Sequence, residues 1–285
     1  MLTPTSLDEA LDALASDPTA HLLAGGTDLM VEVNFGHRRP ATVIAVGGIE
    51  ELRSVSVDRP ASMVRIGSAV TMTDLMAGEV ADLVPALADA MRTVGSPQIR
   101  NAATLGGNLG TCSPAGDTLP VLAALGATIE LASLEGRRTL PFEEYMVGPK
   151  KSARRPDEIV ASIAVPIVSG WQGFAKVGTR NAMVIAVCSA ALVVDTDRRR
   201  VSTALGSVGP VMMRPAEADA WLADRVDWDG HTLAADQPAA REVALEFGRR
   251  CAAAARPIDD HRSTAEYRRH GVGVLARRLV TRAFA

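Results

Sequence analysis

Two glycine-rich segments carry the residue types and spacing that most favour ligand chemistry. The first is LAGGTD at 23–28, and the second is TLGGNLGTCSPAGD at 104–117. Each combines adjacent glycines with small hydroxyl or amide side chains, ends in an aspartate, and contains no lysine or arginine. Glycine lets a backbone approach a ligand closely, and loops of this kind expose N–H groups to anions. Two such loops could enclose a pyrophosphate, so the pattern indicates a bound dinucleotide.

A purely structural interpretation of these glycines competes with the binding one. Gly25-Gly26 could form a tight turn between a strand and a helix, and 106–108 a hairpin turn, because paired glycines are general turn signals. The length of the second segment favours binding, since long connections are often functional. The segment lacks the GxGxxG pattern of dinucleotide-binding βαβ units and the GK[ST] of Walker loops, so it fits neither common fold.

Composition describes an ordinary globular chain of 285 residues, 47% hydrophobic and 22% charged, with a net charge of −3. This charge gives no reason to expect a nucleic-acid partner. No apolar run is long enough to span a bilayer and no leader follows Met1, which predicts a cytoplasmic protein without membrane insertion. Three distant cysteines and five histidines show neither disulfide nor metal-ligand spacing, so we expect no metal on this chain.

The elements that must position the glycine segments follow from capping and periodicity. Ser6–Glu9 has the pattern of a capping box, so we expect a helix to open the chain. We predict strands at 21–24, 42–46, 63–67, 128–132, 138–140 and 158–165. We predict further helices at 28–33, 73–81, 85–94, 119–125 and 142–145, with Gly95 as a C-cap.

The pattern changes near 167–170, where we expect a domain boundary. Three strand candidates follow at 171–177, 183–195 and 201–208, and then helices at 215–224, 239–255 and 263–284. A three-stranded sheet backed by helices fits this segment. Such an α+β unit has an ordinary domain size.

Motifs along nearly the whole chain resemble one protein family. They are AGGTD at 24–28, QIRNAATLGGNL at 98–109, SPAGD at 113–117, PDEI at 156–159, FAK at 174–176, GSVGP at 206–210 and DHRSTAEYRR at 260–269. They resemble the FAD-binding (medium) subunit of the molybdenum hydroxylases, which include carbon monoxide dehydrogenase and, as a flavin domain, xanthine dehydrogenase. The second glycine segment with its preceding QIRN is the most specific of these motifs.

The resemblance implies an α+β fold with FAD binding of the vanillyl-alcohol oxidase type. Two small α+β subdomains would clamp FAD, and a third domain would cover it. On this chain the FAD-binding domain would span 1–168, with subdomains at about 1–55 and 56–168. The C-terminal domain, of the carbon monoxide dehydrogenase flavoprotein type, would span 169–285.

The family's motifs, matched to this sequence, imply which residues bind FAD. The first loop would hold the pyrophosphate through the backbone of Leu23, Ala24, Gly25, Gly26, Thr27, Asp28 and Leu29. The second segment would line the rest of the cofactor with Ala103, Thr104, Gly107, Asn108, Thr111, Ser113 and Asp117. Val94 would lie near the adenine, Arg154 beside the isoalloxazine and Lys176 close to the flavin ring.

Three of these residues also have ordinary structural interpretations, which the sequence leaves open. Asp117 could cap the helix from Thr118 instead of, or besides, accepting hydrogen bonds from sugar hydroxyls. Arg154 lies in a basic stretch that could be a solvated loop. Lys176 could extend along its strand toward water, or its charge could stabilise the reduced anionic flavin.

No set of residues for acid–base or nucleophilic catalysis is visible, which suits a protein whose chemistry belongs to its cofactor. The resemblance implies an electron-transfer subunit of a larger oxidoreductase. A large subunit would carry molybdopterin, and a small subunit with [2Fe–2S] clusters would pass electrons to this chain's FAD. FAD would deliver them to NAD⁺, a quinone or oxygen.

Two other functions stay open: a free-standing flavin-dependent oxidase or reductase of the same fold, and a protein whose loops bind no flavin. The last helix offers one candidate contact surface for a partner subunit, or alternatively a solvated face. Its arginines are Arg268, Arg269, Arg277, Arg278 and Arg282.

Overall fold

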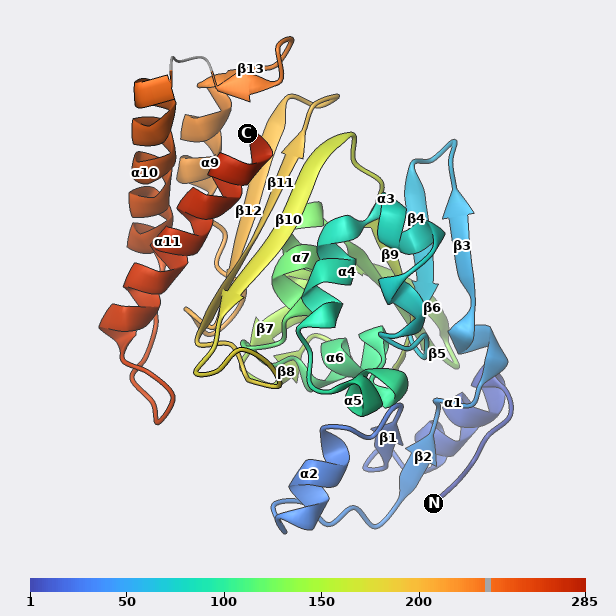
Figure 1. The fold of residues 1–285 in the computed structure, drawn as a ribbon. Helices are drawn as coiled ribbons and strands as arrows, with labels where there is room; N and C mark the ends of the chain where they lie inside the picture. The colour runs from blue at the N-terminus through green and yellow to red at the C-terminus, as the bar shows by residue number, and fades with distance from the viewer. Residues whose placement is uncertain (234–236) are drawn as a thin grey trace. The chain divides into compact units, whose positions relative to one another are not determined.

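The computed structural model describes residues 1–233 and 237–285, which form two compact units, each assembled from three segments of the chain (Figure 1). Unit 1 comprises Met1–Leu75, Gly95–Ser113 and Gly126–Pro166. Unit 2 comprises Met76–Val94, Pro114–Leu125 and the described part of Ile167–Ala285. Two segments of unit 2 therefore precede the linear boundary at 168. That boundary, and the division of 1–168 into two subdomains, stay predictions.

Unit 1 is built on a five-stranded antiparallel sheet with the order β3-β4-β9-β5-β6. Its strands are β3 (Val55–Asp58), β4 (Met63–Gly67), β9 (Ile159–Pro166), β5 (Thr128–Ser133) and β6 (Gly136–Pro141). β9 lies at the centre of the sheet and is almost wholly buried, which accounts for its apolar sequence. β3 lies at an edge and is mostly exposed, so no apolar periodicity predicts it.

A parallel pair of short strands, β1 (His21–Leu23) and β2 (Val43–Ala45), carries the first glycine loop, which runs into α2 (Leu29–Asn34). α1 (Leu7–Ser16) buries its apolar face beside β2. These predicted elements are confirmed. The remaining short elements of unit 1 are η1 (Glu50–Arg53), α5 (Pro97–Ala102), α6 (Leu105–Thr111), α8 (Phe142–Tyr145), β7 (Met146–Gly148) and β8 (Lys151–Ser152).

The capping box at the start of α1 is confirmed in one half and altered in the other. The Ser6 side chain accepts a hydrogen bond from the Glu9 N–H at 3.2 Å, as an N-cap does. The Glu9 carboxylate accepts chiefly from the N–H and hydroxyl of Thr5, at 2.8 and 3.0 Å, and the Ser6 N–H contributes less. The helix therefore starts where the sequence predicts, and the Glu9 side chain also fixes Thr5, the residue before the N-cap.

Two predicted segments have a different secondary structure from the one expected. The helix expected at 73–81 is a 3₁₀ turn, η2 (Asp74–Met76), followed by α3 (Glu79–Leu83). Gly78 interrupts them with a φ of 74°, which a continuous right-handed helix does not contain. The second glycine segment, expected to be a loop, is helical over α6, with the Thr104 side chain as its N-cap.

Unit 2 is built on the predicted three-stranded antiparallel sheet, β10 (Gly170–Val177), β11 (Cys188–Asp195) and β12 (Arg200–Gly206). Helices α4 and α7 cover one face, and α9 and α11 cover the other, with α10 packed on α9 and α11 (Figure 1). The helices of unit 2, apart from α3, are α4 (Pro85–Arg92), α7 (Thr118–Leu125), α9 (Ala216–Ala223), α10 (Gln237–Ala254) and α11 (Ala265–Ala283). A hairpin, β13 (Val226–Asp227) and β14 (Thr232–Leu233), completes the described elements.

The burial of β11 follows from the packing of helices on both faces of the sheet. All its residues are buried, because helices cover both faces of the strand. The strand begins at Cys188 instead of the predicted 183. Met183 has a φ of 50°, which is incompatible with extended backbone, and this accounts for the later start. Gly95 also differs from its predicted role: α4 ends at Arg92, so Gly95 lies beyond the cap.

One buried carboxyl group of unit 2 leads to a pH prediction. Asp219, in α9, accepts a hydrogen bond from the Thr203 N–H at 2.9 Å, while its Oδ1 is buried without a partner. Burial raises the pKa of Asp219 to about 6, and the bonds from Thr203 offset this only in part. The folded chain therefore binds a proton here more tightly than the unfolded chain. Its stability falls as pH rises from the unfolded pKa through the folded one.

Replacing Asp219 by asparagine is expected to remove this loss. At pH 7 the variant should be more stable than wild type by roughly 2–3 kcal/mol, since one pKa unit is worth about 1.4 kcal/mol. Urea unfolding at pH 4.5, 5.5 and 7 measures the difference. Asp224→Asn, at the exposed end of the same helix, serves as the control. A D219N variant with the wild-type pH dependence would contradict the prediction.

Candidate functional site

The first glycine loop offers backbone donors that the described part of the chain leaves unused. Within residues 1–233 and 237–285, the N–H groups of Gly25, Gly26 and Thr27 donate to no protein acceptor. All three residues are half-buried, and Gly26 has a φ of 72°. Successive amides in such a turn form a concave nest with positive partial charge, which suits an anion.

Glycine is also required here by close packing. A Cβ at Gly25 would lie 1.8 Å from the carbonyl oxygen of Ala102, at the end of α5. A Cβ at Gly106 would lie 2.4 Å from the Cβ of Ser68. The first loop therefore satisfies both interpretations of its sequence: it is a tight turn between a strand and a helix, and it presents free donors.

The second glycine segment has no such nest in its helical part. The first three amides of α6 donate to Val70, Ser68 and the Thr104 hydroxyl at 3.2, 3.0 and 2.9 Å respectively. The first amides of this helix are therefore not free for a pyrophosphate, because they are already bonded within the protein. A role of residues 112–117 in binding the cofactor stays a prediction. What this helix offers a ligand is side chains.

Unit 1 brings several predicted site residues together. The Thr111 hydroxyl donates to the Asp28 carboxylate at 3.3 Å, so the two glycine segments meet. A Cβ at Gly107 would lie 3.8 Å from that of Ala24. Ala103 is buried, and its N–H and carbonyl are both hydrogen-bonded within the protein. It could therefore contact a ligand only through its methyl group. The half-buried members of the predicted set in unit 1 also include Leu23, Leu29, Asn108 and Ser113.

Arg154 is held by its own loop. Its Nη1 donates to the carbonyl oxygens of Glu158 and Arg155 at 2.6 and 3.1 Å. Glu158 is buried and accepts two bonds from Arg138, at 2.6 and 2.9 Å. Burial acts to raise the pKa of Glu158, but hydrogen bonds from Arg138 and the Arg155 N–H bring it below its ordinary value. The loop is thus ordered, and a place for Arg154 beside the isoalloxazine stays a prediction.

In unit 2, Asp117 and Lys176 form a buried ion pair. The Lys176 Nζ donates to the Asp117 Oδ2 at 2.5 Å, and the two side chains are 9% and 6% exposed. The ammonium also donates to the carbonyl oxygens of Thr93 at 2.9 Å and Val184 at 3.0 Å. A lysine ammonium has three protons, so these three acceptors account for all of them.

This pair decides two alternatives that the sequence leaves open. Lys176 does not extend toward water, because its ammonium is bonded inside the protein. Asp117 does not cap α7 through the amides that an N-cap serves. The Leu119 N–H donates to the Gly116 carbonyl, and Pro120 has no N–H.

The second oxygen of Asp117 has no partner within the described part of the chain. Asp117 Oδ1 is buried without a hydrogen-bond partner, although the Thr93 hydroxyl and Lys176 both serve Oδ2. Burial raises the pKa of Asp117, and Lys176 and Thr93 act against that rise. An unpaired buried acceptor is costly, so a donor from outside the chain would stabilise this arrangement. Val94, predicted near the adenine, directly follows Thr93 and is half-buried.

Two residues that contact this ion pair were not predicted from the sequence. Thr93 directly precedes Val94 in the sequence, and its hydroxyl donates to Asp117. The only sequence feature that could have indicated Thr93 is its position next to a predicted site residue. Val184 contributes its backbone carbonyl, for which no side-chain type gives a signal.

The cysteines are buried thiols rather than ligands or nucleophiles. All three are free. Burial raises the pKa of Cys112 to about 11 and that of Cys188 to about 12, so neither forms a thiolate readily. Cys112 donates to the Lys151 carbonyl at 3.3 Å. In the described ranges, no group of three His, Cys, Asp or Glu side chains could hold a metal ion.

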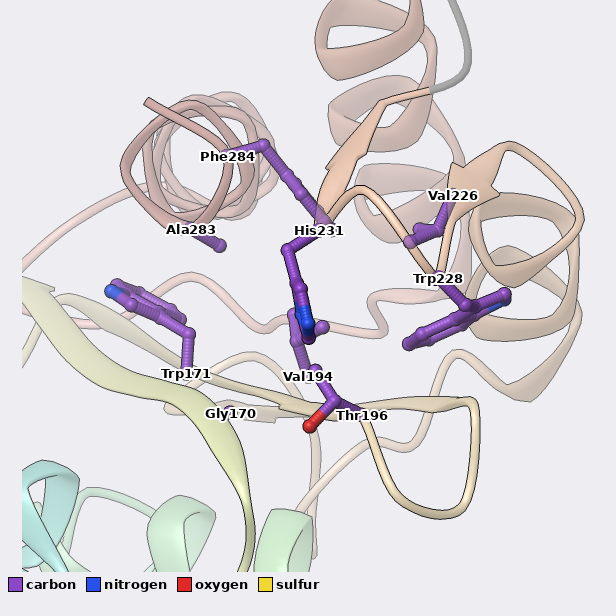
Figure 2. A pocket seen from close by; sticks show the side chains of 9 residues that line it. All are labelled: Gly170, Trp171, Val194, Thr196, Val226, Trp228, His231, Ala283 and Phe284. Atoms are coloured by element: carbon purple, nitrogen blue, oxygen red, sulfur yellow. The ribbon is translucent and has the colours of Figure 1, made fainter.

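A pocket of about 200 Å³ lies elsewhere in unit 2 (Figure 2). Trp171, Trp228 and Phe284 form much of its wall, and His231 points into it near Thr196 (Figure 2). Its lining contains no lysine, arginine or carboxylate and none of the predicted FAD-binding residues. The pocket is therefore separate from the predicted cofactor site.

Comparisons with known proteins identify the family. Residues 1–168 match the FAD binding domain in molybdopterin dehydrogenase, and residues 174–283 match the CO dehydrogenase flavoprotein C-terminal domain. The nicotine 6-hydroxylase medium subunit of Paenarthrobacter nicotinovorans is 31% identical over 289 residues, which cover 99% of this chain and 96% of that protein. The caffeine dehydrogenase subunit beta of Pseudomonas sp. strain CBB1 is 31% identical over 291 residues, with 99% and 93% covered.

Comparison with solved structures supports the same family. The reconstituted CO dehydrogenase from Oligotropha carboxidovorans superposes with a TM-score of 0.87 at 26% identity, covering 99% of this chain and 96% of that one. Quinoline 2-oxidoreductase from Pseudomonas putida 86 shares the fold, with a TM-score of 0.88 at 24% identity and 99% and 95% covered. The predicted α+β FAD-binding fold with its C-terminal domain is confirmed. The chain belongs to the FAD-binding subunits of the molybdenum hydroxylase family of oxidoreductases.

Proposed function

We propose that this chain works as the medium subunit of a complex, taking electrons from an iron–sulfur subunit and passing them from FAD to NAD⁺, a quinone or oxygen. A molybdopterin-binding large subunit would supply those electrons by oxidising the substrate. Relatives named as medium or FAD-binding subunits support this assignment. The sequence has three cysteines, fewer than the four that ligate a [2Fe–2S] cluster, so the clusters would lie on a partner.

The residues of unit 1 fit the phosphate part of FAD. We assign the pyrophosphate to the unused N–H groups of Gly25, Gly26 and Thr27, which bind anions through fixed dipoles without a side-chain cation. Asn108 and Thr111, on α6, would supply side-chain hydrogen bonds to the cofactor. Thr111 already joins the two glycine segments through Asp28.

Asp117 and Lys176 fit a hydroxyl-bearing group of FAD. The orphaned Oδ1 of Asp117 carries the proposal, because it would accept a hydrogen bond from a ribose or ribityl hydroxyl. Lys176 would then act mainly through Asp117: it holds the carboxylate in place and supplies a positive charge at the site. FAD, when bound, supplies both one-electron and two-electron chemistry, while the protein sets its position and the surrounding field.

Isolation of the native complex tests the proposal. A tag on this chain should co-purify a molybdenum-containing polypeptide and an iron–sulfur polypeptide with bound FAD. Substrate added anaerobically should bleach the flavin only in that complex. A chain that is isolated alone, carries FAD and turns over its own small substrate would instead support the free-standing oxidase or reductase.

The cellular compartment and the domain boundaries of this chain are proposals as well. No helix in the described part of the chain is long and apolar enough to cross a bilayer. We keep the cytoplasm as the proposed compartment, and 1–168 with 169–285 as the proposed domains. Limited proteolysis of the purified chain would test the boundary by showing whether cleavage concentrates at 166–170.

A further inference from the structure

Arg268 is a buried arginine on the apolar face of α11. It is 4% exposed and shares its helix face with Val272, Leu275 and Leu279, which are also buried. The sequence suggested that the arginines of this helix could form a contact surface or a solvated face. Both are wrong for Arg268, because its side chain lies inside the protein rather than on the surface. Its Nη1 and Nη2 find partners there, as a buried charge requires, while its Nε is buried without one.

The partners of Arg268 are two backbone carbonyls and one carboxylate. Nη1 donates to the Val187 carbonyl at 2.7 Å and to the Ser207 carbonyl at 3.0 Å. Nη2 donates to the Asp260 Oδ1 at 2.7 Å. A planar guanidinium can span separate acceptors in this way, whereas a lysine ammonium presents its donors from one atom. We call this arrangement the Arg268 clamp.

One branch of the clamp leads to the segment that carries Asp117. Ser207 follows β12 with a φ of 61°, a left-handed conformation that costs a non-glycine residue about 1–2 kcal/mol. Its carbonyl is bonded by Arg268, and its N–H donates to the Pro114 carbonyl at 2.8 Å. Pro114 lies three residues before Asp117. Arg268 therefore holds the strained residue that anchors the start of 114–117.

The other branch leads to Lys176. Arg268 donates to the Val187 carbonyl. The N–H of Val187 donates to the Val177 carbonyl at 2.8 Å. Val177 is the strand neighbour of Lys176, whose ammonium in turn donates to the Val184 carbonyl. The connection before β11 is thus fixed at 187 by Arg268 and at 184 by Lys176.

We propose that Arg268 is a positioning residue of the flavin site: it fixes, through Ser207 and Val187, the two segments that set Asp117 and Lys176. It does so without contacting the cofactor itself. This inference rests on the proposed function, because it assigns a consequence for FAD. Loss of the clamp should let the Asp117–Lys176 pair shift while the sheet of unit 2 stays folded.

The test compares FAD binding and the flavin midpoint potential in four variants of the full chain. Arg268→Met is expected to weaken FAD binding at least tenfold and to shift the potential. Arg268→Lys should fall between this variant and wild type. Arg269→Gln, exposed on the same helix, should behave as wild type. Leu279→Ala, which creates a cavity under α11, should lower stability but leave the potential unchanged.

The outcomes separate positioning from simple stabilisation. A potential shift in R268M that is absent in the destabilised L279A supports the proposal. Wild-type FAD affinity and potential in folded R268M would overturn it. If R268M does not fold, R268K and Asp260→Asn carry the same test, and unchanged potentials in both would overturn it. Failure of wild type itself to bind FAD would instead overturn the proposed function.

Discussion

Replacing Lys176 by methionine is expected to abolish tight FAD binding and to destabilise the chain by about 3–5 kcal/mol, the usual cost of removing one partner of a buried ion pair. The loss has two physical parts. Asp117, 6% exposed, would keep a buried carboxylate without its counter-ion. The carbonyls of Thr93 and Val184 would lose their donor as well. Fluorescence titration with FAD and urea unfolding measure the two effects.

The pH dependence of this variant gives an independent check. Without Lys176, only the hydrogen bond from Thr93 opposes the effect of burial on Asp117, so its folded pKa rises further above the unfolded value. Stability should therefore be best preserved at low pH and fall as pH rises through that folded pKa. Adding Asp117→Asn should restore much of the stability but not FAD binding. Lys151→Met, at an exposed position, is the control. A K176M variant with wild-type stability and FAD affinity would contradict the described pairing.

Replacing Gly25 by alanine is expected to have the second large effect. The new Cβ would lie 1.8 Å from the Ala102 carbonyl oxygen, and a backbone atom cannot rotate away as a side chain can. The first loop must therefore move off α5, at a cost of about 1–3 kcal/mol or more for overpacking. The unused N–H groups beside it would move too, so FAD binding should fall by more than tenfold.

Gly48→Ala provides the matched control, because nothing lies within 4 Å of a Cβ built there. It should retain wild-type stability and FAD affinity. Thermal melts of FAD-free chains report the packing cost, and FAD titration reports the loss of the nest. Retention of wild-type affinity by G25A would contradict the assignment of the pyrophosphate to this loop.

Elements with a clear pattern were predictable. The capping box at Ser6 placed the start of α1, and apolar runs placed β9 and α7. The helical state of α6 was not predicted, because two adjacent glycines oppose a helix by propensity. Thr104 reverses that preference by capping the helix, and Gly106 is tolerated because it packs on Ser68.

The candidate site was predictable in its residues but not in its pairing. Asp117 and Lys176 are 59 residues apart, so no local spacing reveals that they bond to each other. Their pairing depends on packing among α4, α7 and β10, which brings distant segments into unit 2. Arg268 did leave a signal. Its spacing of four, seven and eleven residues to Val272, Leu275 and Leu279 places it on the apolar face of a helix.

The central claim, that this chain binds FAD through its own residues, is tested most directly by the visible absorption spectrum of the purified chain. The released cofactor would be identified by mass. We predict a flavin spectrum with about one FAD per chain, either as isolated or after reconstitution of the folded apoprotein. A folded chain that stays colourless and takes up no added FAD would contradict the account. It would leave the glycine segments as packing turns and Asp117 as a buried acceptor without a ligand.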